Sequence, residues 1–199
     1  MSAGREADGA DPARRAGVGT GPGAVLRPWT ADDAPALRAA VAGDADLARQ
    51  TGGADLSTDE AAAAYVRRHL APRGPRSYAF AVAVDGLVVG NVGIGAVDEV
   101  HATAWVSYWL AATHRGRGLA VAALVGASSW AVRELGTFRL ELGHRVNNPA
   151  SCRVATRAGY PAEGIERAKL RYGAERFDVE THARLATDPA PGVAGLPVR

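Results

Sequence analysis

Apolar residues in the central part of the chain follow two different periods, which predict strands and helices in a defined order. Residues 78–84 alternate large and small apolar side chains, as a β-strand does. Asp85-Gly86 then predicts a two-residue hairpin turn, and residues 87–97 predict the returning strand. Similar patterns predict further strands at residues 25–29, 104–110, 139–146, 165–172 and 176–185. The apolar residues 119–135 end at Gly136, which predicts a helix with a glycine after its last turn.

Capping residues indicate the remaining helices. Thr30 precedes the acidic pair Asp32 and Asp33, as at the start of a helix. The segment 57–60 has capping-box spacing before a helix over 61–70, and residues 151–158 predict a short helix. The resulting order is β-α-α-β-β-β-α-β-α-β-β. It predicts an α+β, three-layer fold, in which a mixed, mostly antiparallel twisted sheet of six to seven strands carries helices on both faces.

The two ends of the chain differ in composition from this central part. Residues 1–22 are Gly, Ala, Asp, Arg and Pro with almost nothing to bury, which predicts a disordered N-terminal tail. Residues 187–199 are rich in proline and predict a flexible C-terminal tail. The remaining residues, 23–186, are numerous enough for one well-buried core and are expected to form a single domain.

Charge and cysteine content narrow the function classes. The 23 basic and 21 acidic residues leave a net charge of +2, too small to drive nucleic-acid or membrane binding by the bulk field. An RNA-binding module that uses the arginines remains an alternative, against which this balance argues. The single cysteine, Cys152, excludes an internal disulfide and fits a reducing, cytoplasmic compartment. No secretory signal or membrane span is expected. The five histidines show no metal-ligand spacing, so no metal site is expected.

A turn rich in glycine and arginine lies between the strand 104–110 and the helix that begins at Leu119. It reads His114-Arg115-Gly116-Arg117-Gly118. The first turn of a helix presents unpaired N–H groups and the positive end of the helix dipole, and together these bind anions. Glycines let a phosphate approach the backbone, and arginines add charged donors. The turn therefore predicts a phosphate or pyrophosphate site, with a solvated basic turn as the plainer alternative.

The same turn and several later motifs resemble the GNAT N-acetyltransferase superfamily. Arg115-Gly116-Arg117-Gly118-Leu119-Ala120 matches its R/Q-x-x-G-x-G/A signature. The motifs that resemble the RimJ/RimL-like branch are Tyr108-Trp109-Leu110, Arg139-Leu140-Glu141, Asn148-x-x-Ser151 and Ala158-Gly159-Tyr160. The resemblance spans about residues 24–186. It implies the GNAT fold and acetyl-CoA as the co-substrate, without a metal.

The resemblance also implies where the cofactor binds. The N–H groups of the turn would hold the pyrophosphate, and the end of the preceding strand would pair with the pantetheine arm. The implied cofactor-binding residues are Trp109, Leu110, Ala111, Arg115, Gly116, Arg117, Gly118, Leu119, Ala120, Asn148 and Ser151.

Two residues are the catalytic candidates. Glu141 is expected to act as the general base, directly or through water, at the point where its strand diverges toward the thioester. Ser151 is expected to give a proton to the leaving thiolate, because Ala155 stands where many GNAT members carry a tyrosine. The plainer alternatives are that Ser151 or Asn148 caps the helix, and that Glu141 is an outward-facing polar residue.

The expected reaction is direct attack of a neutral primary amine on the thioester. An α-amine, with a pKa of about 7.8, loses its proton roughly 3.5 kcal/mol more cheaply than a lysine of about 10.4. The acceptor is therefore expected to be a protein N-terminal α-amine or a small-molecule amine. The alternatives are a non-catalytic acyl-CoA-binding regulatory module and an aminoglycoside-type antibiotic acetyltransferase. Asp44, Asp46 and Asp55 predict either a solvated face or an acidic acceptor site, and a homodimer is left open.

Overall fold

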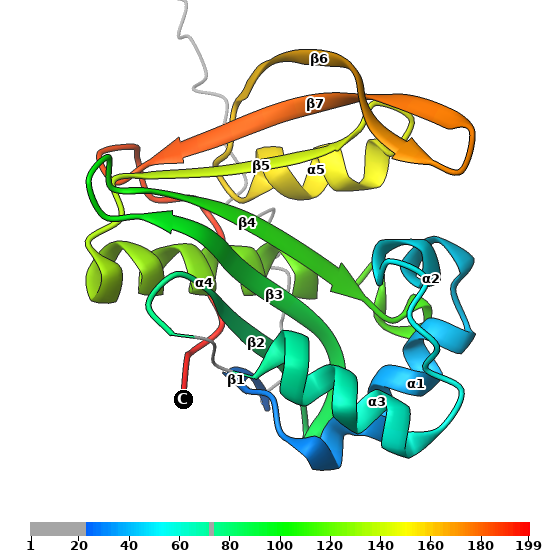
Figure 1. Cartoon of the computed structure of the whole chain (residues 1–199). Coiled ribbons are helices and arrows are strands. Elements are labelled where there is room, and N and C mark those ends of the chain that lie inside the picture. Colours follow the sequence, from blue (N-terminus) through cyan, green and yellow to red (C-terminus); the bar gives the residue numbers. More distant parts are fainter. Residues whose placement is uncertain (1–22, 72–73) are drawn as a thin grey trace, which may run out of the picture.

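A seven-stranded sheet forms the centre of the computed structural model, which describes residues 23–71 and 74–199 (Figure 1). Its strands are β1 (Ala24–Pro28), β2 (Tyr78–Val84), β3 (Leu87–Asp98), β4 (Thr103–Leu110), β5 (Arg139–Arg145), β6 (Ala162–Tyr172) and β7 (Glu175–Leu185). They lie in the order β1-β2-β3-β4-β5-β7-β6. The β4–β5 pair is parallel and the other five neighbouring pairs are antiparallel. The predicted mixed, mostly antiparallel sheet is confirmed.

Helices cover both faces of this sheet, as predicted (Figure 1). They are α1 (Ala34–Ala42), α2 (Ala45–Gln50), α3 (Asp59–Tyr65), α4 (Leu119–Leu135) and α5 (Pro149–Arg157), with short turns at Ala31–Asp33, Val66–Leu70 and Ala112–His114. One core joins α4 and α5 to the sheet, and a second core joins α1 and α3 to the opposite face. The sequence did not predict α2. It also placed the cap of α3 at Ser57, whereas the side chain of Thr58 accepts the hydrogen bond from the Ala61 amide.

The parallel strands β4 and β5 pair with each other at one end only. The register joins Thr103 to Arg139 and continues to Trp105 and Glu141, where it stops. Beyond this point the two strands diverge like the arms of a V (Figure 1). The carboxyl-terminal half of β4 consequently has no β5 partner along one edge, and the chain passes from this arm into the start of α4.

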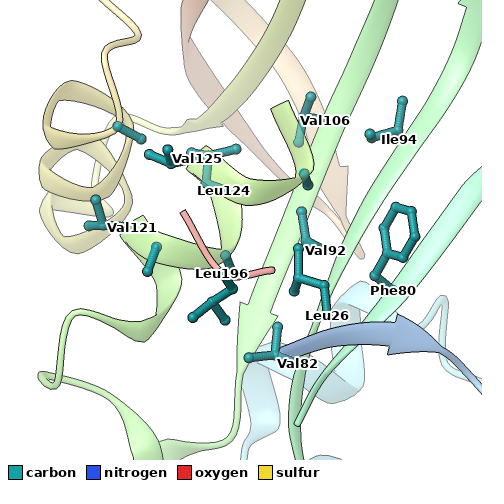
Figure 2. Packing of buried hydrophobic residues seen from close by; sticks show 14 of the residues in the cluster. Leu26, Phe80, Val82, Val92, Ile94, Val106, Val121, Leu124, Val125 and Leu196 are labelled. Atoms are coloured by element: carbon teal, nitrogen blue, oxygen red, sulfur yellow. The ribbon is translucent and has the colours of Figure 1, made fainter. Parts of the chain in front are cut away.

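The C-terminal segment is not the flexible tail that its prolines predicted. Leu196 is buried, and its amide donates to the Ala122 carbonyl of α4 at 2.9 Å. The Leu26 amide donates to Pro197, and the Arg199 amide donates back to Leu26, both at 2.9 Å. The segment thus pairs with β1 and fills the space between β1 and α4 (Figure 2). Proline content misled the prediction because a few apolar side chains and three backbone bonds suffice to dock a short segment.

The predicted N-terminal tail, residues 1–22, lies outside the described residues. Within the described part of the chain, no helix has both the length and the hydrophobicity that crossing a bilayer requires.

Candidate active site between the diverging strands

The N-terminus of α4 has the backbone geometry that the predicted anion site requires. Gly116 and Gly118 have φ angles of 77° and 78°. This left-handed conformation is unfavourable for residues that carry a Cβ atom, and glycine adopts it without strain. Among the residues that the structure describes, no side chain caps α4, and the first backbone bond of the helix runs from the Ala122 amide to the Gly118 carbonyl. The amides of the first turn therefore remain available to a ligand at the positive end of the helix dipole.

A pocket of about 440 Å³ opens in front of this helix end, between the diverging arms of β4 and β5. Its volume is typical of small-molecule sites. Nine of the eleven predicted cofactor-binding residues line it: Trp109, Leu110, Arg115, Gly116, Gly118, Leu119, Ala120, Asn148 and Ser151. The strand end and the turn that follows it are thus brought into one pocket with the N-x-x-S step at residues 148–151, which lies much further along the chain.

Two predicted cofactor-binding residues do not line the pocket. The Ala111 amide already donates to the Val89 carbonyl of β3 at 2.8 Å, so it is not free to bind a ligand. Arg117 is exposed, and its guanidinium donates to the Thr113 carbonyl at 3.2 Å on the outside of the turn. The periodicity of the sequence cannot reveal these competing local hydrogen bonds.

Arg115 is held in place from two sides. Its Nε donates to the Leu110 carbonyl at 3.0 Å, and its guanidinium forms an ion pair with Asp44. Asp44 also caps α2 by accepting from the Asp46 and Leu47 amides. Burial alone would raise the pKa of Asp44, but the Leu47 amide and Arg115 outweigh it, so that the pKa is lowered. Asp44 therefore ties α2 to the turn at the mouth of the pocket.

The acidic residues before α3 do not form an open site for a cationic amine. Asp46 lines the pocket, but it is paired with Arg145 at 3.2 Å and with Arg49. Asp55 accepts from the Ser57 amide at 2.9 Å in a local turn and does not line the pocket. With Asp44 paired to Arg115, these carboxylates are neutralised by arginines or used in local hydrogen bonds.

Three arginines and one tyrosine that the sequence did not assign to the site also line the pocket. Arg153 and Arg157 are four residues apart on α5 and share one face of that helix, a spacing that was readable in the sequence. Arg145 ends β5. The phenol of Tyr108 donates to the Ser151 carbonyl at 3.1 Å, and burial raises the pKa of Tyr108 to about 12. The pocket is therefore rich in cationic groups at its edge, and Tyr108 connects β4 to α5 across it.

The two catalytic candidates lie in different cavities. Ser151 lines the large pocket, where its amide donates to Asn148 Oδ1 at 3.2 Å, so that Asn148 also caps α5. Glu141 lines a second cavity of about 350 Å³ and accepts from Arg139 Nε at 2.8 Å. It is the last β5 residue in register with β4, which places it at the vertex of the V, where the strands were expected to diverge. The role of Glu141 as a general base stays a prediction.

Comparison with known proteins identifies the family to which this chain is similar. The family model of the Acetyltransferase (GNAT) domain matches residues 24–161. The ribosomal-protein-serine acetyltransferase of Escherichia coli is 28% identical over 112 residues, which are 55% of this chain and 63% of that protein. The matched segments span 48% to 63% of the length of the curated relatives.

Solved structures share the fold. The ribosomal-protein α-N-acetyltransferase RimL in complex with coenzyme A superimposes with a TM-score of 0.68 at 19% identity, covering 84% of this chain and 97% of that one. Mycobacterium smegmatis RimJ in complex with CoA-disulfide gives a TM-score of 0.67 at 25% identity and covers 81% of each chain. The family model spans more than half of the sequence, and the chain therefore belongs to the GNAT acetyltransferase family, in which it resembles the RimJ/RimL-like branch as its motifs predicted.

Proposed function

We propose that this protein transfers an acetyl group from acetyl-CoA to a primary amine by direct attack of the amine on the thioester. One observation carries the proposal: the large pocket joins the uncapped start of α4 to the unpaired edge of β4. An anion-binding helix end beside a free strand edge suits a ligand with a diphosphate at one end and an amide-containing arm at the other.

The residues of the pocket divide the binding between them. The amides at the start of α4 and Arg115 hold the diphosphate, and Arg153 and Arg157 supply charge for the remaining phosphate. Trp109 and Leu110, on the unpaired arm of β4, accompany the pantetheine arm. The thioester then lies toward the vertex of the V. Positioning of this kind supplies a large part of the rate in a reaction between two bound substrates.

The reaction needs less help from acid and base groups than from positioning of the two substrates. The leaving thiolate has a pKa of about 8.5, so a weak donor such as the Ser151 hydroxyl is sufficient. Glu141, at the vertex, receives the proton of the attacking amine directly or through water. An α-amine needs the least help, since its pKa is about 7.8. Protein N-terminal α-amines are therefore the favoured acceptors. The name of the RimL structure agrees with this class, and the name of the E. coli relative agrees with a protein acceptor.

Calorimetry with coenzyme A and mass spectrometry of an amine panel test the proposal. The panel contains N-terminal peptides, polyamines, amino acids and aminoglycosides, each incubated with acetyl-CoA. We expect binding of coenzyme A and a mass increase of one acetyl group on an α-amine. Absence of coenzyme A binding by the folded protein refutes the proposal. Binding without acetylation of any amine supports the regulatory module instead, and acetylation of aminoglycosides alone supports the antibiotic acetyltransferase.

Paired variants test the two proton-transfer roles. Glu141→Gln and Ser151→Ala are expected to lower kcat by about tenfold or more while coenzyme A still binds. Glu134→Gln and Ser129→Ala are matched controls, because both residues are exposed on α4, and both should keep the rate of the wild type. Unchanged kcat in Glu141→Gln would remove Glu141 from the mechanism and leave positioning as the main source of catalysis.

A further inference from the structure

Four side chains of metal-binding type meet where β5, β7 and α5 come together, outside the large pocket. They are His144 on β5, Cys152 on α5, and Glu180 and His182 on β7, and their ligand atoms all lie within 4.8 Å of one another. The sheet register brings three of them together. His144 is directly opposite Glu180, and His182 follows two residues later on the same face of β7. Cys152 approaches this face from the first half of α5.

Hydrogen bonds to the backbone fix both imidazole rings. His144 Nδ1 lies 3.0 Å from the Arg145 carbonyl, and His182 Nδ1 lies 2.9 Å from the Tyr160 carbonyl. A carbonyl oxygen only accepts, so each Nδ1 must carry the hydrogen. In the neutral ring the other nitrogen, Nε2, then has a lone pair and no hydrogen.

These lone pairs point at one another. The two Nε2 atoms are 3.0 Å apart, and each lies 3.2 Å from Glu180 Oε2. A carboxylate oxygen is also an acceptor. Three electron-rich atoms at hydrogen-bond distance, without a hydrogen between them in the neutral state, repel each other unless a positive species lies among them. That species is either a proton on one of the imidazoles or a metal cation.

We propose that His144, His182, Glu180 and Cys152 bind one Zn²⁺ ion. Zinc takes nitrogen at about 2.0–2.1 Å and carboxylate oxygen at about 2.0–2.2 Å, so that two such ligands of a tetrahedral ion lie about 3.3 Å apart. The 3.0 and 3.2 Å separations are close to this value. The ionised carboxylate and thiolate would balance the charge of the ion, with the thiol proton passing to water as the sulfur binds.

The surroundings have the properties of metal sites. Ligating histidines commonly donate their second N–H group to a backbone carbonyl, as both rings do here. His144 and His182 are 7% and 1% exposed, whereas Glu180 and Cys152 are half-buried, so an ion can reach the site from solvent. From the sequence, no metal site was expected. That expectation rests on the spacing of the histidines along the chain, which does not register Glu-x-His on one strand opposite a histidine on the next.

Zinc at this position would tie α5 to β5 and β7. Cys152 follows Ser151 directly, so the ion would fix the helix turn that carries the proposed proton donor without touching the reacting atoms. None of the proposed zinc ligands lines the large pocket at the α4 helix end, whereas His182 lines the second cavity together with Glu141. The measurement of zinc content is independent of the proposed acetyl transfer, because it requires neither coenzyme A nor turnover.

Metal stoichiometry tests the proposal directly. Tag-free protein is stripped with EDTA, equilibrated with Zn²⁺, passed through a desalting column and analysed by mass spectrometry of its metal content. We expect one zinc per chain in the wild type, and at least a tenfold loss of retained zinc in Glu180→Gln and His182→Gln. His101→Gln, which removes an exposed histidine far along the chain from the cluster, should retain one zinc. Less than 0.1 zinc per wild-type chain, or equal retention in all variants, overturns the proposal and leaves a shared proton between the imidazoles.

Cobalt identifies the ligands and also detects a folding defect. Co²⁺ in the wild-type site should give the visible bands of a four-coordinate ion together with a sulfur-to-cobalt charge-transfer band. Cys152→Ser should lose the charge-transfer band and keep the visible bands. Circular dichroism establishes that each variant is folded, and Zn²⁺ should raise the Tm of the wild type but not that of Glu180→Gln. A charge-transfer band that survives Cys152→Ser, or an equal Tm shift in both proteins, would contradict the assigned ligands.

Discussion

The backbone oxygen of Leu196 occupies the space that a single methyl group on Gly126 would need. A Cβ built on Gly126 would lie 2.3 Å from that oxygen and 2.9 Å from the Leu196 nitrogen. Gly126 is buried in the middle of α4, where its φ is that of an ordinary helix and alanine would normally be preferred. The glycine is therefore there for the close approach of the C-terminal segment.

Replacing this glycine should reverse the usual effect of alanine in a helix. Gly126→Ala would stabilise an isolated helix by about 1 kcal/mol. Here we expect the free energy of unfolding to fall by about 1–3 kcal/mol, because the new methyl group pushes against backbone that cannot move aside easily. Gly164→Ala is the control, since a Cβ there meets open space. Urea denaturation measures both, and a stabilised Gly126→Ala would show that the C-terminal segment is not docked in solution.

Gly118→Ala should weaken the binding of coenzyme A. The left-handed φ of 78° costs a residue with a Cβ about 1–2 kcal/mol, and relaxing this strain turns the first amides of α4 away from the pocket. We expect the Kd to rise at least tenfold by calorimetry. Gly173→Ala places the same strain in the β6–β7 turn, where φ is 60°. It should lower the Tm with the Kd unchanged, and an equal rise in Kd for both variants would count against an anion site at α4.

The ion pair between Arg27 and Asp33 should make stability depend on acidic pH. The two guanidinium nitrogens lie 2.8 and 2.7 Å from the carboxylate oxygens, and the Thr30 amide donates to the same carboxylate at 2.8 Å. Burial alone would raise the pKa of Asp33, but the hydrogen bonds from Arg27 and Thr30 outweigh it and lower the pKa. The contribution to stability is complete above the unfolded pKa of about 3.9, and it is lost as the pH falls through the lowered folded value.

Asp33→Asn therefore should lower the free energy of unfolding by about 2 kcal/mol at pH 7. The difference from the wild type should shrink as the pH falls below about 4. The exposed neighbour Asp32→Asn is the control and should change little at either pH. Denaturant titrations at pH 7 and pH 3 give the measurement. A deficit in Asp33→Asn that is equally large at both values would mean that the carboxylate charge is not what matters.

Tyr108 should make stability depend on alkaline pH. Burial raises its pKa to about 12, compared with about 10 in an unfolded chain. Between these values the unfolded chain binds fewer protons than the folded one, so the wild type loses stability as the pH rises, by up to roughly 3 kcal/mol.

Tyr108→Phe should lack this loss, although at neutral pH it is about 1 kcal/mol less stable without the bond to Ser151. Denaturation at pH 8 and pH 11 compares it with the wild type and with Tyr172→Phe, which lies at the end of β6. The stabilities of the wild type and Tyr108→Phe should converge at the higher pH. If the gap between them stays constant, the phenol of Tyr108 titrates as a solvent-exposed group does.

Local patterns predicted every strand and every helix except α2, because most of these elements carry their own hydrophobic period and the helices their own capping residues. The Asp85-Gly86 turn is an example, with both residues at positive φ as its hairpin requires. The fate of residues 187–199 was not predictable in this way, since their order comes from Leu196 fitting against a glycine 70 positions earlier in the chain. Docking of that kind is a tertiary effect that composition does not record.

The binding pocket was easier to predict than the catalytic residues. The glycines and arginines of the turn directly precede the start of α4, so the sequence alone shows that they lie at a helix end. Arg145 and Tyr108 reach the pocket only through the divergence of β4 and β5, which no single segment determines. Glu141 lies at the vertex, where the β4–β5 register ends, and its role stays a prediction. Its ion pair with Arg139 and the separate cavity depend on β6 and β7 packing over it.

The divergence of β4 and β5 also leaves a strand edge unpaired inside the sheet rather than at its border. Proteins usually protect such edges at the rim with charges or short strands, because free N–H and C=O groups invite another extended chain to pair with them. Under the proposed function, coenzyme A or its acetyl ester would cover this strand edge. Protein prepared without that molecule would expose a template for strand exchange, and storage with coenzyme A would then protect the sample against aggregation.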